Sequence, residues 1–285
     1  MRKYSTKVLV GGFVYLEAPR WFQDELWVSD VFDFRLYRVT HSGQKNLVCD
    51  VPHRPSGIGF LPDGSPLVVS STDRKLMKVE HGVLSVYADL SQFATGDLND
   101  LVVDEVGQIY VGNFGYDLLA GEPLKPTNLH LVDRDGQIRI AARDLEFPNG
   151  VILKDDGRTL VVAETWSCRL TAFGRHPNGA LSRRRVYADL GQRMPDGICV
   201  DAEGGVWVAS FNSGEFVRVL EGGQITDRIQ CGDVRAVSCC LGGSDGTTLF
   251  CSIYDGSVND LKSLKRAGQI VTAQVHIPAA SFDTS

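Results

Sequence analysis

The stretch that decides the fold is MPDGICVDAEGGVWVASFNSGEFVRV, residues 194–219. It contains one apolar run (ICV), a turn rich in Asp and Gly (DAEGG), a second apolar run (VWVAS) and a third (FVRV). Short runs of β-branched and aromatic residues that are bounded by Gly and Asp are typical of antiparallel strands. The stretch therefore predicts three consecutive strands joined by tight turns.

The same pattern recurs along the chain. It begins at Ser56 (SGIGFLPDGSPLVVSS), Asn99 (NDLVVDEVGQIYVGNF), Asn149 (NGVILKDDGRTLVVAE) and Asp196 (DGICVDAEGGVWVASF), and more loosely at Ala18 and Ala236. These starts are about 38 to 50 residues apart, a period typical of propeller blades with four strands each. No segment longer than about ten residues has a helical apolar period. We therefore predict an all-β fold, a six-bladed β-propeller of four-stranded blades around a central channel.

The two ends of the chain are expected to close one blade. GQIVTAQVHIP (268–278) and KVLVGGFVYL (7–16) both alternate like strands. A ring of blades must be sealed where the chain starts and stops, since two sheet edges otherwise remain unpaired. Residues 1–285 are thus predicted to form a single domain. A β-sandwich of similar size is the alternative, but it offers no reason for a repeat.

Composition excludes several classes of partner. The net charge of −6 disfavours nucleic acid and anionic membrane surfaces, because both require concentrated Lys and Arg. No apolar run approaches the 18 residues or so of a transmembrane helix, and the N-terminal residues do not resemble a signal peptide. The seven cysteines form no CxxC pair, so we expect free thiols in a reducing cytoplasm.

The residues that begin the repeats are expected to meet at one mouth of the channel, because the innermost strands of a propeller line it. They are Glu17, Ser56, Asn99, Asn149, Asp196 and a position near Arg235. Two carboxylates and two amide oxygens suit Ca²⁺, Mg²⁺ or Mn²⁺. Asn-Gly and Asp-Gly are also ordinary turn formers. The pairs at 149 and 196, however, precede an apolar strand, where a hairpin turn is not due.

Four motifs resemble those of the senescence marker protein/gluconolactonase/luciferin-regenerating enzyme (regucalcin-like) superfamily. They are the stretch at 194–219, FPNGVILKDDGRTLVVAET (147–165), LEAPRW (16–21) and VSCCLGG (237–243). The resemblance implies a six-bladed propeller that holds one divalent cation, Ca²⁺ first, with Mn²⁺, Mg²⁺ or Zn²⁺ as alternatives. The implied ligands are Glu17, Asn149 and Asp196.

The resemblance also implies hydrolysis of a cyclic ester, with a small-molecule lactone or ester as substrate. Asn99 matches the family's substrate-contacting Asn, and Asp196 is the implied general base. A carboxylate bound to a dication accepts protons poorly, so Asp97 is a further candidate base and Glu164 a third.

Two departures from the family favour a substrate less polar than a sugar lactone. Asp97 stands where the gluconolactonase branch has Arg, and NFGYDLLAGEPLKP (113–126) is an apolar, aromatic insert that we expect to cover the mouth. Phe114, Tyr116 and Trp166 are expected to line the substrate pocket.

Two alternatives remain open: a calcium-binding or scaffold propeller with little turnover, and a phosphotriesterase-like hydrolase. The second usually needs a channel histidine, and none of the six His begins an inner strand. No GxSxG elbow is present, which disfavours a serine hydrolase.

Overall fold

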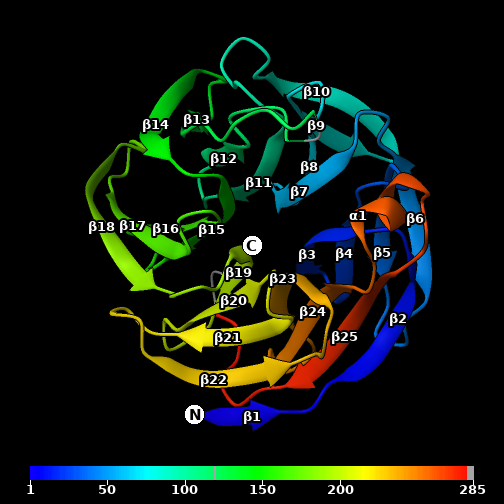
Figure 1. Cartoon of the computed structure of the whole chain (residues 1–285). Coiled ribbons are helices and arrows are strands. Elements are labelled where there is room, and N and C mark those ends of the chain that lie inside the picture. Colours follow the sequence, from blue (N-terminus) through cyan, green and yellow to red (C-terminus); the bar gives the residue numbers. More distant parts are fainter. Residues whose placement is uncertain (119, 281–285) are drawn as a thin grey trace.

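A computed structural model describes residues 1–118 and 120–280. Its strands form six antiparallel sheets arranged as a ring around a central axis (Figure 1). The predicted six-bladed propeller is thereby confirmed. From the channel outwards, the first sheet contains β3 (Leu16–Phe22), β4 (Glu25–Asp30), β5 (Arg35–Val39) and β6 (Lys45–Asp50). The second sheet contains β7 (Pro55–Phe60), β8 (Pro66–Ser70), β9 (Lys75–Glu80) and β10 (Val83–Asp89). The third sheet contains β11 (Leu98–Val103), β12 (Ile109–Asn113), β13 (Thr127–Val132) and β14 (Ile138–Leu145).

The remaining sheets complete the ring. The fourth sheet contains β15 (Pro148–Lys154), β16 (Thr159–Glu164), β17 (Arg169–Arg175) and β18 (Leu181–Asp189). The fifth sheet contains β19 (Pro195–Val200), β20 (Val206–Ser210), β21 (Glu215–Val219) and β22 (Ile225–Gln230). The sixth sheet contains β23 (Arg235–Gly242), β24 (Thr248–Tyr254), β25 (Gly268–Gln274) and β2 (Lys7–Phe13). The fifth sheet departs from the four-stranded pattern, because β1 (Arg2–Tyr4) adds to β22 as a parallel fifth strand.

The sixth sheet joins the two ends of the chain. Its outermost strand, β2, pairs antiparallel with β25, and Lys7 lies opposite Thr272 (Figure 1). The edge of β25 is therefore covered by a strand from the other end of the chain, so that the last sheet has the same four-stranded width as its neighbours.

Apolar side chains fill the space between neighbouring sheets. The inner strands β7, β11 and β19 are buried along their whole length. Trp207 in β20 belongs to this core and is 1% exposed. Such packing excludes water from the space between neighbouring sheets, whereas outer strands such as β10 remain largely exposed.

Glycines allow neighbouring inner strands to approach closely at one mouth of the channel. A Cβ on Gly150 would lie 2.7 Å from the Ile198 nitrogen and 2.8 Å from the Asp196 carbonyl oxygen. A Cβ on Gly197 would lie 1.9 Å from Ser238 Oγ. The Asn-Gly and Asp-Gly pairs at 149 and 196 therefore serve strand packing rather than a hairpin turn.

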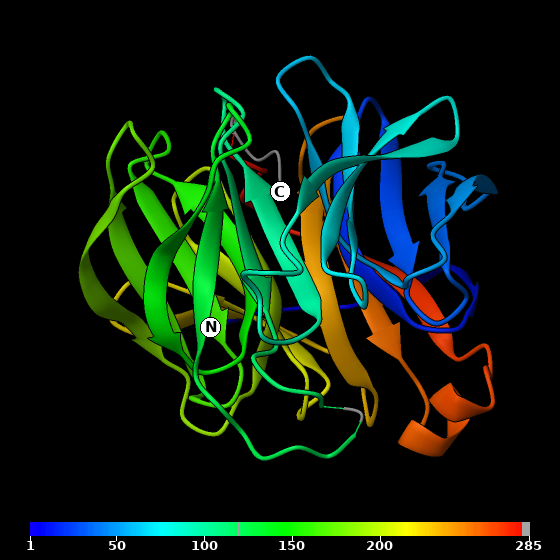
Figure 2. The same ribbon diagram turned by 90° about the horizontal axis from the view of Figure 1, so that it is seen from above.

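One short helix is found among the described residues, α1 (Val258–Lys262), with a capping box between Ser257 and Asp260. In Figure 2, α1 and the loop residues 114–118 and 120–126 project from the same end of the propeller. Across the part of the chain that is described, no helix has the length and apolar character needed to span a membrane.

Candidate functional site

Five of the six residues predicted to converge occupy equivalent positions in the structure. Each is the second residue of an inner strand, and Arg235 is the first residue of the sixth, β23. Equivalent positions in equivalent blades lie at the same height along the channel, so these side chains gather at one mouth. The five are Glu17 in β3, Ser56 in β7, Asn99 in β11, Asn149 in β15 and Asp196 in β19.

Glu17 and Asp196 are electrostatically coupled. Burial raises the pKa of Glu17 well above its ordinary value, and the negative charges of Asp196 and Asp100 raise it further. Burial likewise raises the pKa of Asp196, although a hydrogen bond from Asn149 opposes the rise. Two carboxylates in this arrangement favour the binding of a compensating positive charge.

The side chain of Asp196 has an unmet hydrogen-bonding capacity. Asp196 is 4% exposed, and its Oδ1 has no hydrogen-bond partner among the described residues. A buried carboxylate oxygen without a donor is energetically costly. This oxygen is the feature of the ring that most directly indicates a missing ligand.

The two ring asparagines are held by neighbouring backbone and hydroxyl groups. Asn149 Nδ2 donates to Thr165 Oγ1 at 3.3 Å, and Thr165 Oγ1 in turn donates to the Pro195 carbonyl at 2.8 Å. Asn99 Nδ2 donates to the Pro148 carbonyl at 3.4 Å, while its Oδ1 accepts from Ser56 Oγ at 3.4 Å. The amide oxygen of Asn99 is therefore already used, whereas that of Asn149 takes no part in these bonds.

The donor chemistry of Glu17, Asn149 and Asp196 fits a divalent cation. All three offer hard oxygen ligands of the type that Ca²⁺ prefers, and the orphaned Asp196 oxygen needs a positive partner. Within residues 1–118 and 120–280, no group of three or more His, Cys, Asp or Glu side chains is arranged to hold a metal. A cation here would therefore require the Asn149 amide as well as the two carboxylates.

The sequence did not predict a buried ion pair that lies beside the ring. Arg20 Nη2 is 2.7 Å from Asp100 Oδ1, and both side chains are almost completely buried. The pair connects β3 with β11, which are separated along the ring by β7. Arg20 balances Asp100 and lowers the pKa of Glu17. The sequence feature that could have indicated this ion pair is the arginine inside the apolar run LEAPRW (16–21).

The two further candidate bases lie in different environments. Asp97 lies next to β11, with Oδ2 3.5 Å from Arg54 Nη1, and burial raises its pKa although Arg54 opposes the rise. Glu164 is fully buried and accepts hydrogen bonds from Arg169 at 3.0 and 3.1 Å and from Thr171. Its carboxylate is thus occupied within its own blade, and the hypothesis of Glu164 as a base is not supported.

Aromatic side chains gather between the third and fourth blades at the same mouth. Phe114 stacks on Phe147 with centroids 4.6 Å apart, and Phe147 lies 5.3 Å from Trp166. Trp166 Nε1 donates to Tyr116 Oη at 2.9 Å. The sequence predicted three of these residues as pocket residues but missed Phe147.

This aromatic cluster borders the ring. Phe114 N donates to the Asp97 carbonyl, and Thr165 N donates to the Phe147 carbonyl. Of the 113–126 insert, residues 117–118 and 120–126 are exposed, and residue 119 lies outside the described residues. The insert therefore contributes buried aromatic residues only at its start.

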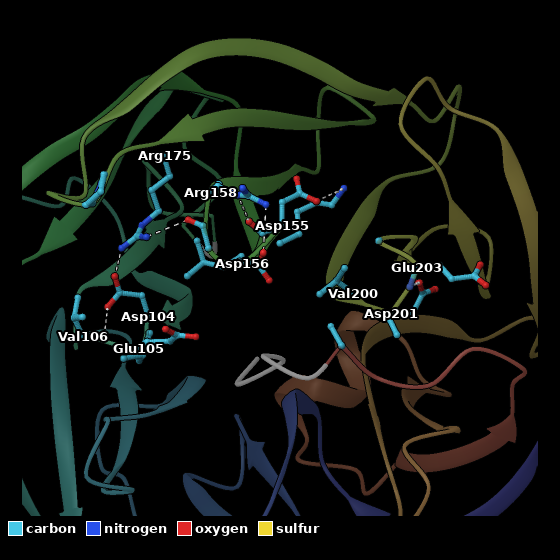
Figure 3. Close-up of a pocket in the computed structure, with 18 residues that line it drawn as sticks. Asp104, Glu105, Val106, Asp155, Asp156, Arg158, Arg175, Val200, Asp201 and Glu203 are labelled. Atoms are coloured by element: carbon cyan, nitrogen blue, oxygen red, sulfur yellow. Dashed lines mark hydrogen bonds and ion pairs between the residues drawn. The ribbon is translucent and has the colours of Figure 1, made fainter.

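A pocket of about 660 Å³ lies at the opposite mouth of the channel (Figure 3). It is lined by the turns that follow β11, β15 and β19, and none of the predicted site residues belongs to it. Many of its charged side chains are paired with each other, as Arg175 is with Asp104 and Arg158 with Asp156. This pocket is separate from the oxygen-bearing ring.

The fold is a six-bladed propeller, and side chains with oxygen donors surround one mouth of its channel. Both features agree with the superfamily that the sequence motifs resemble. Residues 16–254 match the family described as SMP-30/Gluconolactonase/LRE-like region, and the chain belongs to this family. The predicted family membership is thereby confirmed.

Three relatives illustrate the range of the family. The chain is 24% identical to a 6-deoxy-6-sulfogluconolactonase from Pseudomonas putida over 93% of this chain and 92% of that protein. It is 25% identical to the pentonolactonase XacC from Haloferax volcanii, over 84% and 81% of the two chains. The crystal structure of a calcium-binding protein, regucalcin, from Agrobacterium tumefaciens superimposes with a TM-score of 0.80 at 19% identity, covering 98% and 99% of the chains.

Proposed function

We propose that this protein is a divalent-metal-dependent lactonase that acts at the ring mouth. The observation that carries the proposal is the buried Asp196 oxygen, which has no hydrogen-bond partner among the described residues, beside a second, half-buried carboxylate, Glu17. Membership of a family with named lactonases supports the reaction class. The seven cysteines are free thiols, which suits a reducing compartment such as the cytoplasm.

Glu17, Asn149 and Asp196 would hold the cation. A divalent cation, Ca²⁺ first, supplies positive charge near the ester carbonyl, where negative charge develops as water attacks. Asn99, already oriented by Ser56 and the Pro148 carbonyl, presents its amide edge to the substrate. These residues account for binding and charge stabilisation.

Asp196 and Asp97 are the two candidates for the general base that accepts a proton from the attacking water. Asp97 is the better base because it is not a proposed ligand and because burial raises its pKa, which makes its carboxylate more basic. Its carboxylate lies only two residues from Asn99, and Arg54 holds it in place.

The aromatic cluster supports a substrate less polar than a sugar lactone. Phe114 and Trp166 are partly exposed, while Phe147 and Tyr116 are buried beneath them. Apolar rings of this kind stabilise an aliphatic or aromatic substituent by removing its surface from water. Phe114, Tyr116 and Trp166 are therefore proposed as substrate-binding residues.

Turnover of a lactone panel tests the proposal. Sugar, aliphatic and aromatic lactones would be titrated by pH-stat with added Ca²⁺, Mn²⁺ or Zn²⁺. Asp196→Asn should lower kcat by about 10²-fold or more and remove calorimetric cation binding, since it deletes one ligand charge. Asp156→Asn, an exposed substitution at the opposite mouth, is the matched control.

Three outcomes are informative. Full turnover by Asp196→Asn would show that the ring has been assigned wrongly. Cation binding without turnover of any lactone would favour the calcium-binding alternative. Turnover of sugar lactones alone would contradict the proposed role of the aromatic cluster.

A further inference from the structure

Arg235 lies at the start of the inner strand of the sixth blade, at the same mouth as the ring residues. It begins β23, and its guanidinium lies over the ring of Phe211, 5.4 Å from the centroid. Phe211 N donates to the Met194 carbonyl at 2.9 Å, which places Phe211 beside the chain segment that enters β19 two residues before Asp196. The guanidinium is thus held by an aromatic face at the mouth that carries the proposed cation ligands.

Tyr15 connects Arg235 with the acidic part of the ring. The Tyr15 ring contacts Tyr254 at 5.2 Å between centroids, and Tyr254 is the strand partner of Arg235. Tyr15 immediately precedes β3, which carries Glu17 two residues further on. The contact between Tyr15 and Tyr254 therefore brings the start of β3 and the start of β23 together at this mouth.

Among the described residues, no carboxylate forms an ion pair with Arg235. Arg54, at the same mouth, also lies over an aromatic ring, Phe32, at 5.0 Å, but it is paired with Asp97. Arg235 is exposed, and within the described parts of the chain no carboxylate oxygen lies within 4.0 Å of its nitrogens. A guanidinium presents a planar set of donors that matches carboxylate, sulfonate and phosphate groups.

We propose that Arg235, supported by Phe211, selects lactones that carry an acidic substituent. The proposal rests on the proposed lactonase function and deepens it by naming one substituent of the substrate, an acidic group on the side of the sixth blade, while the apolar part of the substrate lies against the aromatic cluster of the third and fourth blades. The proposed cation compensates the charges of Glu17 and Asp196, and Arg20 balances Asp100, so the guanidinium of Arg235 is available to an anionic substituent. Its attraction for that substituent fixes which end of the substrate faces away from Glu17 and Asp196.

Paired substrates test the inference. Each pair shares one lactone ring and differs only in a free carboxylate against its methyl ester. Arg235→Gln should lower kcat/KM for the carboxylate by about 10-fold to 100-fold, the range of a lost charge-assisted hydrogen bond, with the ester changed less than about twofold. Arg235→Lys should recover part of the loss. Arg38→Gln is the matched control, because Arg38 also stacks on an aromatic ring, Trp27, at 5.7 Å in the first blade.

The binding of the hydroxy-acid products separates the two proposals. If no lactone is hydrolysed, the lactonase function fails, but calorimetry with the ring-opened diacid and its monomethyl ester still tests Arg235. Binding of the diacid at least about tenfold more tightly, with the difference lost in Arg235→Gln, supports the inference. Equal binding of the two products, or an equal loss for carboxylate and ester substrates in Arg235→Gln, overturns it.

Discussion

Among the partly and fully buried carboxylates of this protein, some have raised and others lowered pKa values. The groups around each carboxylate decide the direction of its shift. Burial alone would raise the pKa of Glu164, but hydrogen bonds from Arg169 and Thr171 outweigh burial and lower it. Glu17 and Asp196 have raised pKa values, since burial and neighbouring negative charge act in the same direction. The first kind stabilises a blade, and the second kind belongs to the proposed cation site.

Glu164→Gln should destabilise the protein in a pH-dependent way. The pKa of Glu164 is lower in the folded protein than its ordinary value of 4.5, so its contribution is present above about pH 4.5 and is lost as pH falls through the folded-state pKa. We expect a loss of about 2 kcal/mol at pH 7, the size of a charged hydrogen bond, and a smaller loss near pH 3.

Urea unfolding at both pH values measures this effect. Glu80→Gln is the control, because the Glu80 side chain is 58% exposed and its pair with Lys78 contributes little. An equal loss for Glu164→Gln at pH 7 and pH 3 would contradict the ionic role of this residue.

At the scale of elements, the inner strands place the ring and their glycines set its width. Gly57, Gly150 and Gly197 each follow a ring residue, and a Cβ at any of them would approach a neighbouring inner strand to within 3.0 Å. The polar residue and the glycine after it thus act together. The first provides an oxygen, and the second lets the strand carrying it lie close to the next.

Gly150→Ala should disturb stability and cation binding together. The added methyl group meets backbone atoms of Asp196, Gly197 and Ile198, which cannot move independently of β19. Overpacking of this kind costs about 1–3 kcal/mol. Denaturant unfolding and calorimetric Ca²⁺ titration would measure the two effects. Gly11→Ala is the control, since its nearest neighbour is the flexible Gln269 side chain at 3.3 Å. Unchanged Ca²⁺ affinity in Gly150→Ala would separate the glycine from the ring.

At the scale of the whole molecule, closure depends on contacts between the two ends of the chain. β2 covers the edge of β25, whereas β1 only adds to β22, with Tyr4 Oη donating to Asp227 Oδ1 at 2.7 Å. The two N-terminal strands therefore differ in importance. One completes a blade, and the other extends a blade that is already complete.

Stepwise truncation tests this difference. Removal of residues 1–5 deletes β1 and should lower Tm by only a few degrees, because one short edge strand is lost. Removal of residues 1–13 also deletes β2, exposes the β25 edge and should cause aggregation or loss of a single cooperative transition. Thermal unfolding and light scattering measure both. Similar behaviour of the two truncations would show that closure by β2 is dispensable.

The sequence by itself predicted the blades and the residues that begin the inner strands. Apolar runs, Asp-Gly turns and their period are local properties, and they are the same whichever blade lies next. The apolar runs ICV and VWVAS, for example, lie in β19 and β20. The positions of Asn149 and Asp196 within their repeats followed from the same regularity.

Contacts between blades were decided only by the tertiary structure. Arg20 and Asp100 lie 80 residues apart, and neither repeats in the other blades in a way that would indicate the pair. The stacking of Phe147 on Phe114 and of Arg235 on Phe211 likewise depends on how adjacent blades are rotated against each other. A repeat specifies what each blade contains. Which side chains meet across the channel depends on the closed ring, because only closure sets the distances between blades.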